Sequence, residues 1–144
     1  CIIGSLVDNI TMNSLSIPVA FGELIDKLTI LEIKLERIHD PAKCANVRQE
    51  WDLLIATWTK APEFQIDIAA ERAQLKAVNE SLWEIEDRIR LKEGAQEFDA
   101  EFIELARSVY FKNDERAAIK RNINLQLGSL LIEEKSYQDY RVSP

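Results

Sequence analysis

The longest helical pattern in the sequence runs from about Ile66 to Leu91, and the rest of the chain has to pack around it. Apolar residues recur there mostly three and four positions apart, which is the spacing of one buried stripe on an α-helix. The stripe consists of Ile68, Leu75, Val78, Leu82, Ile85 and Ile89. We predict a helix over residues 63–93 that ends near Gly94.

Further helices are predicted on both sides of this one. Residues 22–39 form one helix, which stops ahead of Pro41. Residues 42–59 form another, with Trp51 and Trp58 interpreted as core residues. Asp99 is suited to cap a helix that turns Phe102, Leu105 and Val109 inward. Asn113 and Asp114 offer a second cap, so the sequence leaves open whether a fifth helix begins there.

The segments outside these helices are less regular. Residues 15–21 alternate between apolar and other side chains, but Pro18 removes a backbone donor, so an extended arm packed on the helices is favoured over an edge strand. Periodicity does not decide the conformation of residues 129–140. We predict an all-α antiparallel bundle of four to five helices with a short extended N-terminal arm. Residues 1–13 are expected to be a disordered extension, and residues 14–144 a single helical domain.

The helix over residues 22–39 is apolar on more than one side. One seam consists of Phe21, Leu24, Leu28, Leu31, Leu35 and Ile38, and Ile25, Ile30 and Ile33 lie away from it. Such a helix is either central in its domain or shared with a partner chain. We predict both, with the helix at the centre and a homodimer contact along its second face.

Composition limits the classes of function. The chain carries 25 acidic and 18 basic residues, and its net charge of −7 disfavours binding to nucleic acid or to anionic membranes. The long helical patterns contain no apolar run of membrane-spanning length. Cys1 and Cys44 form neither a CxxC motif nor a disulfide framework. These features predict a cytoplasmic protein with reduced thiols.

Motifs for metals and cofactors are incomplete. His39 is the one histidine, so Glu36-x-x-His39 supplies only half of a di-iron site. Glu80, Glu84 and Asp87 share a helical face, but it points away from the apolar stripe, so we expect it to be solvated and not to bind Mg²⁺. There is no Gly-rich phosphate loop and no Cys/His zinc set. We predict no metal and no cofactor, and whether the protein is an enzyme stays open.

One polar cluster is a candidate site. If the chain folds back around Gly94, Lys112 arrives at Asn79 and Arg116 near Leu75, where the pattern otherwise places apolar residues. Cations beside a helix start suit an anion site. The alternative is an internal polar network in which Glu86 or Glu71 pairs with the cations. The candidate anion or polar site comprises Asn79, Trp83, Glu86, Arg90, Arg107, Lys112, Asn113 and Arg116.

Four stretches carry a resemblance to a known family. They read IPVAFGELIDKLTILEIK (17–34), VNESLWEIED (78–87), ARSVYFKNDERAAIK (106–120) and EEKSY (133–137). The chain is similar in these stretches to a family of small bacterial proteins defined only as a domain of unknown function. The resemblance implies a one-domain protein and no particular activity. One departure is Ala20, where the family pattern leads us to expect a serine that caps the first helix.

The sequence therefore supports two hypotheses for function. Abundant apolar faces and incomplete catalytic motifs favour a non-catalytic interaction or assembly module that forms a homodimer through its first helix. The alternative is a small enzyme or binding protein for an anionic metabolite. It would act through Lys112, Arg116 and Arg107 with Glu86, near the turn between the fourth and fifth helices.

Overall fold

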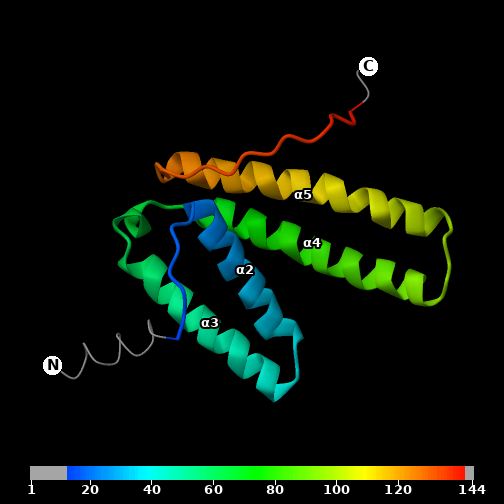
Figure 1. Cartoon of the computed structure of the whole chain (residues 1–144), viewed down its shortest axis with the longest axis horizontal. Helices are drawn as coiled ribbons and strands as arrows, with labels where there is room; N and C mark the ends of the chain where they lie inside the picture. Colours follow the sequence, from blue (N-terminus) through cyan, green and yellow to red (C-terminus); the bar gives the residue numbers. More distant parts are fainter. Residues whose placement is uncertain (1–12, 142–144) are drawn as a thin grey trace.

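The computed structural model describes residues 13–141, and within them it contains four α-helices, one short 3₁₀ helix and no strand. Two antiparallel hairpins make up the fold (Figure 1). The first joins α2 (Phe21–Arg37) to α3 (Pro41–Lys60), and the second joins α4 (Ala69–Gly94) to α5 (Ala100–Gln126). The all-α prediction is confirmed.

The boundaries of the first hairpin follow from local capping. Ala20 supplies no side-chain bond at the start of α2, as its departure from the family pattern led us to expect. Asp40 caps α3, because its Oδ1 accepts a hydrogen bond of 2.8 Å from the Lys43 amide, and Pro41 occupies the first position. Pro62 then begins the 3₁₀ helix η1 (Pro62–Gln65). This turn delays α4, so the predicted start at residue 63 was wrong.

The α5 helix is continuous, so the possible break at Asn113 and Asp114 does not occur. Neither residue is a proline or a glycine, and each disfavours a helix interior by only tenths of a kcal/mol (roughly 0.5–0.7). Asp114 instead accepts a hydrogen bond from the Tyr140 hydroxyl in the C-terminal segment. Residues 100–126 therefore form one helix instead of two.

Polar contacts between side chains at both ends of the hairpin fix the pairing of α4 with α5. Near the turn, Arg88 forms an ion pair of 2.6 Å with Glu101, and at the far end Gln126 donates a hydrogen bond of 2.7 Å to Glu71. Asp99 caps α5 by accepting a hydrogen bond of 3.0 Å from the Phe102 amide. The predicted antiparallel fold-back near Gly94 and the predicted cap are both confirmed.

Helix α2 lies at the centre, in contact with α3, α4 and α5. The core gathers where the first turns of α2 and α4 meet the last turns of α3 and α5, and the axes of α2 and α4 diverge from there (Figure 1). The core residues are Ile25, Leu28, Trp58, Ile68, Leu75, Ile123 and Leu127. Trp58 is buried as predicted, and its ring packs edge-on against Phe21.

The second apolar face of α2 is used within the chain. Ile25 and Ile33 are buried, and Ile30 is half-buried. Ile25 and Ile33 are therefore not available to a second chain, and their burial gives no support to a homodimer through α2. The homodimer stays a prediction.

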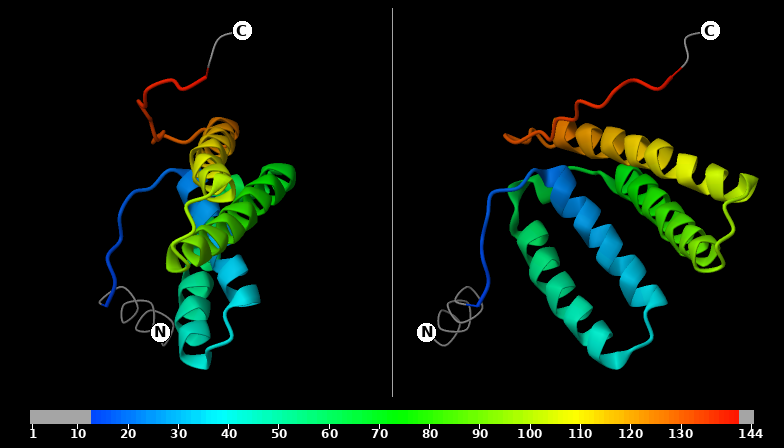
Figure 2. Two further views of the ribbon diagram at one scale, coloured as in Figure 1. Left: turned by 90° about the vertical axis from the view of Figure 1, so that its right-hand side faces the viewer. Right: turned by 45° about the vertical axis from the view of Figure 1, so that its right-hand side comes forward.

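Segments at both ends of the described chain lie outside the two hairpins. Residues 13–20 pass the α3 side, whereas the C-terminal tail, residues 129–141, follows α5 on the opposite side (Figure 2). The predicted packing of an N-terminal arm on the helices was wrong for Leu15, which is 95% exposed. The predicted disordered extension falls mainly on residues 1–12, outside the described residues. No helix in residues 13–141 combines the length and apolar character needed to cross a membrane.

Candidate functional site

A buried carboxylate joins the three helices that form the candidate site. Asp26 of α2 is 1% exposed, and its Oδ1 accepts hydrogen bonds from Arg116 Nε of α5 at 3.0 Å and from Asn79 Nδ2 of α4 at 2.8 Å. Arg116 Nη2 donates to the other carboxylate oxygen, so the pair is bidentate. Hydrogen bonding to Asp26 raises the pKa of Arg116, because it outweighs the opposing effect of burial.

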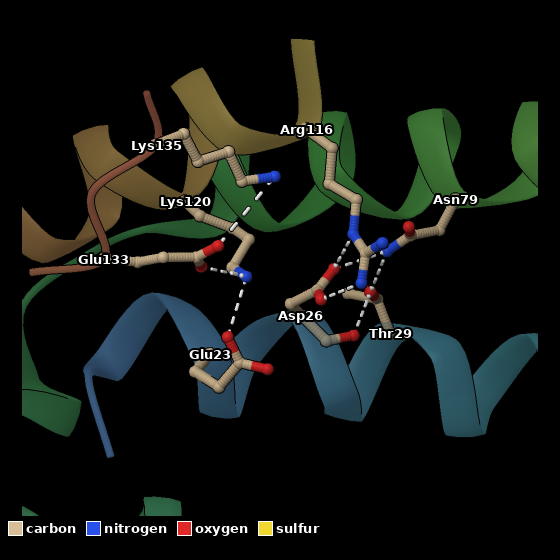
Figure 3. Close-up of polar contacts among 8 residues, drawn as sticks. All are labelled: Glu23, Asp26, Thr29, Asn79, Arg116, Lys120, Glu133 and Lys135. Carbon is tan, nitrogen blue, oxygen red and sulfur yellow. Dashed lines mark hydrogen bonds and ion pairs between the residues drawn. The ribbon is translucent and has the colours of Figure 1, made fainter. Parts of the chain in front are cut away.

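Thr29 completes this polar network (Figure 3). Its hydroxyl donates a hydrogen bond of 2.7 Å to the Asp26 carbonyl and accepts one of 3.0 Å from Asn79 Nδ2. Both hydrogens of the Asn79 amide group are thereby used, and the orientation of its side chain is fixed. Four residues from three helices are locked together.

A second polar contact lies along α5, toward its C-terminal end. Lys120 is 8% exposed, and its Nζ is 2.7 Å from both Glu23 of α2 and Glu133 of the tail (Figure 3). Burial alone lowers the pKa of Lys120, but the hydrogen bonds that it donates to Glu133 and Glu23 overcome this effect and leave the pKa raised. Asn124, one further turn along, accepts a hydrogen bond of 2.6 Å from the Gly22 amide.

A groove opens beside the Asp26 network, between α2, α4 and α5, with a volume of about 510 Å³. Its lining residues are Ile30, Ile33, Lys34, Asn79, Leu82, Trp83, Glu86, Asp87, Asn113 and Arg116. The apolar members come from α2 and α4, on the two walls. Asn79 and Arg116, which belong to the network, contribute the polar part nearest the core.

Several polar groups of the groove have no protein partner. The side chains of Lys34, Trp83, Asp87 and Asn113 make no hydrogen bond or ion pair with any described residue. Lys34 is the exception on its helix, because every other charged side chain of α2 forms an ion pair. A concave surface that combines apolar walls with a few unpaired polar groups is typical of a small-molecule site.

Five of the eight predicted site residues come together in this groove: Asn79, Trp83, Glu86, Asn113 and Arg116. The other three do not line it. Arg90 points outward and pairs with Glu86 at 3.3 Å, and Lys112 pairs with Glu115 at 3.0 Å on the surface of α5. Arg107 is exposed.

The predicted partners of the cations also need correction. Glu86 pairs with Arg90 and Glu71 with Gln126, whereas Arg116 binds Asp26, which the sequence reasoning did not select. Asp26 lies four residues before Ile30, in the row of α2 that was taken for a dimer face. A carboxylate in an otherwise apolar row is the sequence signal by which Asp26 could have been found.

Lys34 and Asp87 were also missed as groove residues. Asp87 belongs to the acidic row that was expected to be solvated, and Glu84 of the same row pairs with Arg37 at 3.3 Å. Within residues 13–141, no group of three or more histidines, cysteines or acidic residues is arranged to hold a metal ion.

The helices and the groove define a small all-α protein with a polar network at its centre and a mixed groove beside it. The chain belongs to the family of unknown function DUF6165, whose model matches residues 15–144. This confirms membership of a family of unknown function. Neither the curated proteins nor the solved structures contain a match to this chain.

Proposed function

We propose that the protein is a non-catalytic binding module that takes a small organic molecule into the groove between α2, α4 and α5. The observation that carries this proposal is the set of unpaired polar groups on apolar walls around a volume of about 510 Å³. Sites for small molecules usually enclose about 300–1,000 Å³ and combine apolar walls with a few oriented polar groups.

The Asp26 network supports the proposal because it gives the groove a rigid inner surface. Arg116 and Asn79 line the groove and are held by hydrogen bonds to a buried carboxylate, so the positions of their side chains are fixed. Binding to a preformed surface avoids the entropic cost of ordering side chains.

The lining also bears on the choice between binding and catalysis. It contains no hydroxyl, thiol or imidazole, and its ionisable groups are Lys34, Glu86, Asp87 and Arg116. The positive charge of Arg116 is balanced by Asp26, and Lys112 lies outside the groove. These contacts favour a groove with both polar and apolar groups over a cluster of cations that binds an anionic metabolite.

A fragment screen followed by NMR of the methyl groups tests the proposal. Groove ligands should shift the methyl signals of Ile30, Ile33 and Leu82, and saturation at about 100 times Kd should add about 2.7 kcal/mol to the free energy of unfolding. Ile30→Trp should fill the groove and abolish these shifts. Leu125→Trp, on an exposed position of α5, is the control that should leave them intact. A screen that moves none of the groove methyls would contradict the proposal.

Self-association is a second candidate function. It is favoured by exposed apolar side chains near the turn of the α4–α5 hairpin, where Leu91, Phe98 and Ile103 are each more than half exposed. Large exposed apolar side chains gathered in one region are typical of interaction sites. Sedimentation velocity over a range of concentrations tests for the homodimer. Ile103→Lys should weaken a dimer that uses this end, and a monomer at all concentrations would contradict it.

A further inference from the structure

We propose that the ligand of the groove is a zwitterion, with a carboxylate and an ammonium group separated by an apolar body. This inference rests on the function proposed above and names the chemical class of the ligand. It starts from opposite charges on opposite walls: Lys34 lies on α2, whereas Glu86 and Asp87 lie on α4.

Lys34 and Asp87 differ from the other charged residues along the boundary between α2 and α4, because they are not paired. Elsewhere along it, charges on the two helices neutralise each other: Arg72 with Glu32, Lys76 with Glu36 at 2.5 Å, and Arg37 with Glu84 at 3.3 Å. Lys34 and Asp87 lie on the same two helices but are not within ion-pair distance of each other or of any other described charge. The groove separates them.

The balance of charge excludes simple ions as the best ligands. The lining carries two cations, Lys34 and Arg116, and two anions, Glu86 and Asp87, so it has no net charge. An anion that reaches Lys34 still meets the carboxylates of α4, and a cation at Asp87 still meets Lys34. A neutral molecule covers both charges without pairing them, which costs free energy. A zwitterion satisfies both walls.

The apolar residues of the lining can accommodate the apolar body. They are Ile30 and Ile33 on α2 and Leu82 and Trp83 on α4. The Trp83 indole offers a flat face for an aromatic or aliphatic body and an unpaired N–H. Near the network, Arg116 uses Nε and Nη2 for Asp26, so its Nη1 keeps donors for the carboxylate of a ligand.

A set of related para-substituted benzene probes tests the charge requirement. 4-(Aminomethyl)benzoate carries both charges on one ring, 4-methylbenzoate only the negative charge, 4-methylbenzylamine only the positive charge, and 4-methylbenzamide neither. Each is titrated into the full chain, and Kd is measured from the methyl signals of Ile30, Ile33 and Leu82. We expect the zwitterion to bind about ten-fold more tightly than each of the other three, because a charged hydrogen bond contributes about 1.5–3 kcal/mol.

Two substitutions separate the charged walls. Lys34→Gln should weaken the zwitterion and 4-methylbenzoate by about ten-fold and should not weaken 4-methylbenzylamine. Asp87→Asn should weaken the zwitterion and 4-methylbenzylamine by about ten-fold and should not weaken 4-methylbenzoate. Lys27→Gln on α2 and Glu80→Gln on α4 are matched controls outside the groove, and neither should change any Kd. Neither Lys34 nor Asp87 has a protein partner, so both variants should fold like the wild type, and their methyl spectra check this directly.

The possible failures are distinguishable. If 4-methylbenzamide binds at the same methyls as tightly as the zwitterion, or if Lys34→Gln and Asp87→Asn leave the order of affinities unchanged, the groove is a site but its ligand is not a zwitterion. If the screen and all four probes leave the groove methyls unmoved, the proposed function fails as well.

Discussion

Asp26 determines much of the chemistry around the groove. Its carboxylate is buried, and it receives hydrogen bonds from Arg116 and Asn79 on two other helices. A buried charge is tolerated only when it is paired and hydrogen-bonded, so each partner is needed for the other. The network thereby sets the positions of two groove residues.

Removal of Arg116 should be far more costly than removal of Lys112. Arg116→Ala leaves Asp26 buried without a cation and should lower the free energy of unfolding by about 3–5 kcal/mol. Lys112→Ala loses only a surface pair with Glu115 and should cost about 0.5 kcal/mol. Urea denaturation measures both values. Equal losses in the two variants would show that Arg116 is not part of a buried pair.

The sequence predicted Arg116 as a buried cation but misplaced Lys112, for an instructive reason. The two residues lie one turn apart in the same row of α5, so helical spacing alone gives them the same environment. They differ because α2 crosses α5 at Arg116, where Asp26 meets it. The point at which a third helix crosses a hairpin depends on packing between elements distant in sequence, which spacing along one helix does not specify.

At the scale of helices, α2 and α5 approach each other closely at Gly22. A Cβ at this position would lie 2.5 Å from the Lys120 carbonyl oxygen, which is backbone. The Gly22 amide also donates to Asn124 Oδ1 at 2.6 Å. The glycine is therefore required by contact between two helices.

Two alanine substitutions test this close approach. Gly22→Ala should push α2 away from α5 and cost about 1–3 kcal/mol of unfolding free energy, as overpacking does. Gly94→Ala, in the last turn of α4, meets no atom within 4 Å and should stabilise the protein by about 0.4–1 kcal/mol. Thermal and urea unfolding of both variants decide the matter. A neutral Gly22→Ala would mean that the helices are not in tight contact there.

The C-terminal tail should respond to acid through Glu133. The hydrogen bond from Lys120 lowers the pKa of Glu133 below its ordinary value of 4.5. A lowered pKa stabilises the folded form above the ordinary value, and this stabilisation is lost as the pH falls through the lower, folded pKa. Amide signals of residues 129–141 should therefore move toward random-coil positions in that acidic range.

Two variants identify the group responsible for this acid response. Glu133→Gln removes the titrating group, so its tail should lack this acid-dependent step. Glu134→Gln, which loses a more exposed pair with Arg121, should keep it. Lys120 stays charged throughout, because its pKa is raised. An unchanged step in Glu133→Gln would assign the acid response to another group.

The elements were predictable to differing degrees. Caps such as Asp40 and Asp99 and breaks such as Pro62 act locally, so helix ends near them are encoded in a few residues. The possible break at Asn113 was not decided by the sequence, because its weak helix preference is overridden by packing of a helix that runs on to Gln126. The groove could be predicted only in part from the sequence, because it needs three helices that cross at defined angles.

At the scale of the whole molecule, the two hairpins share one core through α2. Leu28 of α2 is fully buried in the cluster that also holds Trp58 of α3 and Ile123 of α5. The α4–α5 hairpin therefore depends on a helix that belongs to the other hairpin. The expected consequence is that the hairpins unfold together.

Leu28→Ala tests this coupling. The substitution should lower the free energy of unfolding by about 2–5 kcal/mol, because it leaves a cavity in a core that relaxes only in part. If the hairpins form one cooperative unit, the slowest-exchanging amides of α3 and α5 should lose the same protection in native-state hydrogen exchange. Leu125→Ala, at an exposed position of α5, should change neither by more than about 0.5 kcal/mol. Loss of protection confined to α3 would show that the α4–α5 hairpin is stable without α2. The wall that α2 contributes to the groove would then be free to move independently of the other two helices.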